Sequence, residues 1–117
     1  MMDAKLLGKL RETIKHAVVV PFRDVRFQDR TAPSRNNCHE TVDGWIRENL
    51  EDRAVNGWLV SGLIIDRHSV VEGPDGHLFD ITPLEYRVAF IRHPGTDEEF
   101  WSLPAQVNLA AEFELGD

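Results

Sequence analysis

Residues 67–83, with the sequence RHSVVEGPDGHLFDITP, consist of two apolar segments on either side of Pro74-Asp75-Gly76. Proline presets the first corner of a turn, aspartate tolerates the second corner, and glycine takes the left-handed conformation that closes a three-residue loop. This turn chemistry predicts a β-hairpin with one strand on each side of the loop.

The same turn predicts which residues of the two strands face one another. With Gly73 and His77 flanking the loop, His68 lies opposite Thr82. Asp80 then lies diagonally from His68 on the same face of the hairpin. Diagonal neighbours are close enough for long polar side chains to interact, whereas a slip of one residue would put them on opposite faces. The register therefore predicts a hydrogen bond between His68 and Asp80.

Two helices are predicted before the hairpin from apolar residues spaced three and four apart. The first runs from Met2 to about Ala17, and its apolar stripe comprises Leu6, Leu10, Ile14 and Ala17. The second begins at Asn37-Cys38 and ends before Asn56-Gly57, and its apolar face comprises Val42, Trp45, Ile46 and Leu50. The side chain of Asn36 or Asn37 is expected to cap this second helix. The polar segment 22–37 lacks periodicity and predicts a long loop.

Strands dominate the remainder of the predicted chain. They are expected at Trp58–Ile65, Arg67–Glu72, His77–Ile81, Tyr86–Arg92 and Phe100–Leu103, with Pro104–Leu115 forming either a short helix or an irregular tail. Helices first and a strand meander second predict an α+β fold, in which an N-terminal helix and a central helix that carries Cys38 pack on an antiparallel sheet. A length of 117 residues predicts a single domain over residues 1–117.

Composition and charge narrow the class of function. Acidic residues outnumber basic ones 20 to 13, which gives a formal charge of −7 and argues against binding to nucleic acid or to an anionic membrane. No apolar run approaches the roughly 20 residues of a membrane span, and the N-terminal sequence lacks the apolar block of a signal peptide. Cys38 is the only cysteine, so an internal disulfide is excluded and a reducing, cytoplasmic location is expected.

Cys38, His68 and Asp80 together offer the parts of a thiol-dependent catalytic centre. A thiol needs a helix N-terminus or an imidazolium beside it to become a thiolate. An imidazole must exchange the proton, and a third polar group must hold that imidazole in the correct tautomer. The sequence places a cysteine at a predicted helix start, a histidine on a strand and an aspartate on the partner strand. Gln28, Asn36 and Asn37 are candidate donors to an oxyanion, and the sequence does not choose among them.

The same segments resemble a known superfamily. Leu59–Gly62, His68–Glu72 and Asp75–Pro83 are similar to the strands of the papain-like superfamily, most closely the compact transglutaminase-like domains, and Cys38-His39-Glu40 resembles the cysteine motif of arylamine N-acetyltransferases. The resemblance covers roughly residues 36–83. It implies a papain-like fold with Cys38 as the nucleophile, His68 as the general base and then acid, and Asp80 as the residue that orients His68.

Other interpretations of the same residues stay open. His39 and His77 are alternative imidazoles, but His39 follows Cys38 on a helix and should point about 100° away from it, and His77 beside the turn should be solvated. A metal site built from the cysteine, the histidines and Asp80 is conceivable, although no compact ligand spacing is present. A non-catalytic binding or scaffold module that keeps the papain-like frame is the main alternative to an enzyme.

The sequence therefore predicts a cysteine-dependent acyl-transfer enzyme that hydrolyses or transfers at an amide or ester. The expected substrate is a peptide, an amide or a small acyl compound, and the chemistry needs no cofactor.

Overall fold

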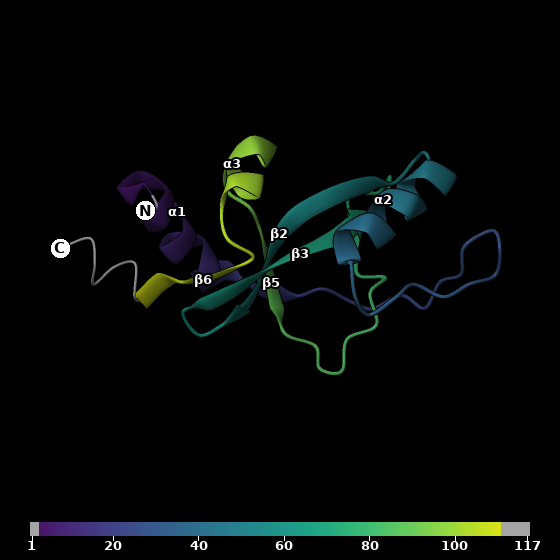
Figure 1. Cartoon of the computed structure of the whole chain (residues 1–117), viewed down its shortest axis with the longest axis horizontal. Coiled ribbons are helices and arrows are strands. Elements are labelled where there is room, and N and C mark those ends of the chain that lie inside the picture. The colour runs from purple at the N-terminus through teal and green to yellow at the C-terminus, as the bar shows by residue number, and fades with distance from the viewer. Residues whose placement is uncertain (1–2, 111–117) are drawn as a thin grey trace. The chain divides into compact units, whose positions relative to one another are not determined.

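The computed structural model describes residues 3–110 and has an α+β fold, as predicted (Figure 1). In this part of the chain the elements are α1 (Ala4–Thr13), the 3-10 helix η1 (Ile14–His16), β1 (Val18–Val19), α2 (Cys38–Glu48), β2 (Arg53–Ser61), β3 (Ile64–Glu72), β4 (Leu78–Phe79), β5 (Ala89–Arg92), α3 (Asp97–Ser102) and β6 (Gln106–Asn108). No helix among these residues is both long enough and apolar enough to cross a membrane.

The chain divides into two compact units. Residues 3–19, 56–67 and 88–110 belong to the first unit, and residues 20–55 and 68–87 belong to the second. The strands β2 and β3 contribute residues to both units. Every residue that the sequence nominates for chemistry lies in the second unit.

The first unit is built around the apolar stripe of α1. Leu6, Leu7 and Leu10 of α1 are buried in one cluster with Trp58 and Phe100. The strands follow the order β1-β5-β2-β3, with β6 paired to β3. The predicted N-terminal helix is thus present, and it ends in the 3-10 turn before Ala17 rather than at it. Met2, the predicted first residue, lies outside the described residues.

The predicted single strand over Trp58–Ile65 is wrong. Instead, β2 ends at Ser61 and β3 begins at Ile64, so a two-residue hairpin loop interrupts the apolar run. Gly62 has a φ of 62° in this loop, a left-handed conformation that glycine adopts without steric cost. β2 also starts earlier than predicted, at Arg53, and runs through Asn56-Gly57. Consecutive apolar residues on both sides of the loop concealed the turn.

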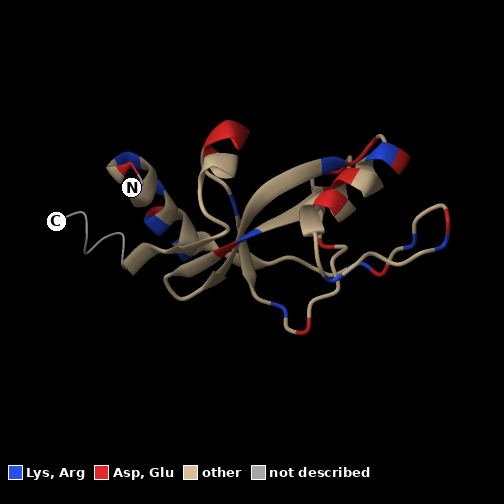
Figure 2. Cartoon of the chain, viewed as in Figure 1, with Lys and Arg blue, Asp and Glu red and all other residues tan. Residues whose placement is uncertain are grey.

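The predicted strand at Phe100–Leu103 is also wrong, because residues 100–102 belong to α3 and Leu103 is its C-cap. Thr96 caps α3 by accepting a hydrogen bond from the backbone N–H of Glu99 at 3.1 Å. The first turn of α3 is acidic, as Figure 2 shows, and negative charge is stabilising at a helix N-terminus. Within the predicted helix or tail at 104–115, β6 forms a strand instead, and residues 111–115 lie outside the described residues.

The second unit is built from α2, the adjoining part of β3, and β4. Val42 of α2 is fully buried against Val71 and Phe79. The hairpin register is the predicted one, because Val71 pairs with Phe79 and Glu72 pairs with Leu78.

The loop of this hairpin has the predicted conformation. The backbone N–H of Gly73 donates to the carbonyl of His77 at 3.0 Å, and Gly76 has a φ of 84°. The segment 22–37 forms no helix, and its only strand-type pairing is an isolated bridge at Phe22, in agreement with the predicted loop.

The helix α2 begins at Cys38, as predicted, but its predicted cap is wrong. Asn37 precedes the helix with a φ of 58° and makes no side-chain capping hydrogen bond. An N-cap residue usually has an extended backbone, from which its side chain reaches the first turn, and the left-handed backbone of Asn37 departs from that geometry. The side chain of Asn37 therefore does not cap the start of α2.

Candidate active site

Asp80 is held by backbone hydrogen bonds directly after β4. Its N–H donates to the carbonyl of Pro21 at 2.8 Å, and its own carbonyl accepts from the N–H of Arg23 at 2.9 Å. These bonds form a parallel bridge between Asp80 and Phe22. A residue fixed by the backbone on both sides presents its side chain in a defined direction.

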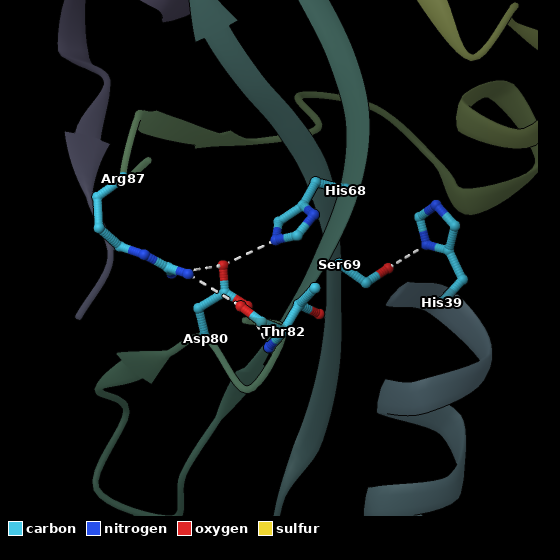
Figure 3. Close-up of polar contacts among 6 residues, drawn as sticks. All are labelled: His39, His68, Ser69, Asp80, Thr82 and Arg87. Carbon is cyan, nitrogen blue, oxygen red and sulfur yellow. Dashed lines mark hydrogen bonds and ion pairs between the residues drawn. The ribbon is translucent and has the colours of Figure 1, made fainter. Parts of the chain in front are cut away.

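The carboxylate of Asp80 is the centre of a buried polar cluster (Figure 3). One oxygen, Oδ1, accepts the backbone N–H of Thr82 at 2.9 Å. The other, Oδ2, accepts from Nε2 of His68 at 2.8 Å and from Nη1 of Arg87 at 3.2 Å. His68 is 3% exposed and Asp80 is 2% exposed, so water contributes little to either group. The hydrogen bond that the hairpin register predicts between His68 and Asp80 is present.

Cys38 lies at the N-terminus of α2 and is partly exposed. The imidazoles of His68 and His39 act on its thiol and favour the thiolate. His68 is thus hydrogen-bonded to Asp80, and it also interacts with the thiol of Cys38.

The two ends of the Cys38–His68 contact are shifted toward their charged forms. Burial acts to raise the pKa of Cys38, but the hydrogen bonds and charges of His39 and His68 outweigh it and lower the pKa from 9.0 to about 6. Burial acts to lower the pKa of His68, but its interactions with Asp80 and then Cys38 outweigh this and raise the pKa from 6.5 to about 9. Both shifts favour the thiolate of Cys38 and the imidazolium of His68 over their neutral forms.

His39 is a site residue whose position the sequence interpretation missed. Its Nδ1 bonds Oγ of Ser69, and its imidazole also lowers the pKa of Cys38, although it was expected to point away from that residue. Ser69 is buried and neighbours His68 on β3. The expected separation of about 100° holds for helix positions, but a side chain in the first turn has room to rotate toward its neighbour. The adjacent pair His68-Ser69 was the only sequence signal for this contact.

The remaining candidates lie elsewhere. The backbone N–H of Gln28 bonds Glu48 at 2.8 Å, at the opposite end of α2 from Cys38, so the proposed oxyanion role of Gln28 is wrong. His77 is exposed, as predicted, and bonds Asp75 at 3.0 Å. Within residues 3–110, no three His, Cys, Asp or Glu side chains form a group that could hold a metal ion.

No protein-family model, no curated protein and no solved structure matches the chain. The likeness to transglutaminase-like domains therefore stays a prediction from the sequence. The function has to be inferred from the side chains of the second unit.

Proposed function

We propose that the protein is a cysteine-dependent acyl-transfer enzyme in which Cys38 is the nucleophile. The observation that carries this proposal is that His68 is hydrogen-bonded to the buried Asp80 at 2.8 Å and also lowers the pKa of the partly exposed thiol of Cys38. A buried carboxylate, an imidazole and an accessible thiol in series are the groups that nucleophilic acyl transfer requires.

The reaction begins with the thiolate of Cys38 and the imidazolium of His68. The sulfur attacks the carbonyl carbon of an amide or ester, and the carbonyl electron pair moves onto oxygen. When the tetrahedral intermediate collapses, the bond to the leaving amine or alcohol breaks and His68 gives that group its proton. A thioester on Cys38 and a neutral His68 remain.

The second half of the reaction resolves the thioester. His68 removes a proton from water, or from an acceptor amine, as that molecule attacks the thioester carbonyl. The carbon–sulfur bond then breaks, the acid or new amide leaves, and the thiolate and the imidazolium are restored. Asp80 accepts the Nε2–H bond of His68 throughout and so holds the imidazole in one orientation.

The start of α2 supports the negative charge that develops in this reaction. The backbone N–H groups of a first helical turn point toward the N-terminus and favour anions there. Asn37 makes no side-chain capping bond to these groups. The N–H of Cys38 itself is our candidate donor to the oxyanion, because a nucleophile's own N–H commonly has this role.

Acylation by p-nitrophenyl acetate tests the proposal. At a pH between the two pKa values, we expect a burst of p-nitrophenolate and an acetyl group on Cys38, detected by mass spectrometry of the proteolysed protein. His68→Ala should slow acylation by roughly 100-fold, as loss of a general acid or base does. His77→Ala is the matched control, because the side chain of His77 is exposed and its ring bonds the neighbouring Asp75 beside the hairpin loop.

The contrary result is equally specific. If Cys38 is acetylated no faster in the unaltered protein than in His68→Ala, the imidazole does not activate the thiol. The protein would then be better described as a binding module.

A further inference from the structure

Two basic side chains share one oxygen of Asp80, and the mechanism above uses only His68. Nη1 of Arg87 lies 3.2 Å from Oδ2, the same oxygen that Nε2 of His68 contacts at 2.8 Å. Figure 3 shows His68 and Arg87 on either side of the carboxylate.

Arg87 is itself held in place by two further contacts. Its Nη2 donates to the backbone carbonyl of Thr82 at 2.9 Å, and its guanidinium lies 5.0 Å from the centre of the Phe22 ring. Thr82 and Phe22 flank Asp80 in the structure, since the N–H of Thr82 bonds that carboxylate and Phe22 is its bridge partner. The arginine is therefore fixed to the same backbone that fixes Asp80.

The charge on the carboxylate needs a partner at every stage of the reaction. The Asp80 side chain is 3% exposed, and a buried charge without a counter-ion is strongly unfavourable. His68 is cationic before it protonates the leaving group and neutral afterwards, so it pairs with Asp80 as a cation for only part of the cycle. A guanidinium remains protonated at all relevant pH values, so Arg87 stays positive throughout.

We infer that Arg87 is a positioning residue that serves as the permanent counter-ion of Asp80, so that His68 can release its proton without leaving the buried carboxylate uncompensated. The inference rests on the proposed function, because it assigns Arg87 a part in the proton transfer from His68. In this role Arg87 does not contact the substrate.

The direction of the effect follows from the charges that surround His68. These are Asp80 and, through it, Arg87 on one side, and Cys38 beside His39 on α2 on the other. Without Arg87, the neutral form of His68 would face a buried carboxylate that has no counter-ion. That form is therefore destabilised, and His68 should hold its proton to a higher pH.

NMR titration of the His68 ring nitrogens tests this without relying on activity. In Arg87→Gln and Arg87→Met, we expect the titration midpoint of His68 to rise by about one pH unit, a tenfold gain in proton affinity. Two neutral replacements of different shape are used, so that the test still stands on one variant if the other fails to fold. Arg87→Lys keeps the charge and should return the midpoint most of the way to its original value.

The matched control is Arg35→Gln. Arg35 lies in the same unit and forms an exposed ion pair with Glu85 at 3.7 Å, so its loss should leave the midpoint unchanged. An Arg87→Gln midpoint that stays in place or falls would overturn the inference, and so would equal shifts in Arg87→Gln and Arg87→Lys, which would indicate a purely structural role.

Repeating the titration in a Cys38→Ser background separates this inference from the proposed function. That background has no thiolate and cannot form a thioester, yet Arg87→Gln should still raise the His68 midpoint. A shift there, combined with failure of acetylation in the unaltered protein, would reject the acyl-transfer proposal and keep the counter-ion role. Acetylation of Cys38 without a shift of the His68 midpoint would keep the acyl-transfer proposal and reject the counter-ion role.

Discussion

The three candidate catalytic residues, Cys38, His68 and Asp80, differ in their exposure to solvent. His68 and Asp80 are almost fully buried, whereas Cys38 is partly exposed. A buried ionic pair is a weak source of stability, because desolvation offsets most of the attraction between the charges. On the proposed function, the burial of His68 and Asp80 would orient one imidazole and keep water from it, while the sulfur stays accessible to a substrate.

Replacing His39 tests whether the second imidazole helps to ionise the thiol. In His39→Gln, we expect the pKa of Cys38 to rise, because the thiolate loses one of the two side chains that lower it. Alkylation by iodoacetamide at a pH near 6 should then fall by roughly threefold to tenfold. Stopped-time mass spectrometry of Cys38 measures the rate, and Ser69→Ala should give a smaller change in the same direction. An unaltered alkylation profile in His39→Gln would show that the contact is incidental.

The polar residues of the site differ in how clearly the sequence alone marks them as candidates. The sequence singled out Asp80, because an aspartate is disfavoured between Phe79 and Ile81 of a predicted strand, and Cys38, because its surroundings are polar. His68 stood out only in combination with these two residues. Arg87 carries no such signal, since an arginine at the end of a loop is ordinary on a protein surface. Its role depends on a contact with Asp80 that only the three-dimensional structure contains.

At the level of elements, the helix α2 carries the thiol and also contains a glycine at position 44. A Cβ atom at Gly44 would lie 3.7 Å from both Arg47 and Phe27, which is ordinary van der Waals contact. Gly44→Ala should therefore stabilise the protein by about 1 kcal/mol, since alanine restricts the unfolded chain and favours the helix. Urea unfolding measures the gain, and the alkylation rate of Cys38 should not change.

Gly57 in β2 provides the contrast to that prediction. A Cβ atom there would collide with the backbone carbonyl of Ile91 and the ring of Phe90 on β5. Gly57→Ala should destabilise the protein by about 2 kcal/mol or more, as overpacking against backbone does. A stabilised Gly57→Ala or a destabilised Gly44→Ala would each contradict the packing described for these elements.

The elements also differ in how well local sequence predicts them. The hairpin of β3 and β4 has its predicted register because Pro74-Asp75-Gly76 determines the loop and hence every pair beyond it. The strand predicted at Phe100–Leu103 failed because aromatic residues favour a strand, while the cap at Thr96 and the acidic first turn favour α3. For this segment, the capping residue and the acidic first turn predict the structure better than the strand preference of the aromatic residues.

At the scale of the whole chain, the candidate site is assembled from two separate segments of one unit, residues 20–55 and 68–87. Hydrophobic periodicity predicts α2, and turn chemistry predicts the β3–β4 hairpin. They cannot predict how the loop at 21–23 pairs with Asp80, because irregular segments have no repeating pattern to align. That pairing fixes the carboxylate, so the sequence could nominate the site residues but not establish how they are held.

The pH dependence of Cys38 alkylation by iodoacetamide is the most direct measure of thiol activation by His68. The pH midpoint of alkylation is a better measure than its absolute rate. Lowering the pKa of a thiol makes the thiolate more abundant but intrinsically less nucleophilic, so the two effects partly cancel in the rate. In the unaltered protein the rate should rise with a midpoint of about 6, and in His68→Ala the midpoint should move up toward the ordinary thiol value of 9.0. Identical profiles for the two proteins, with both midpoints at the ordinary value, would contradict a thiolate–imidazolium pair at Cys38.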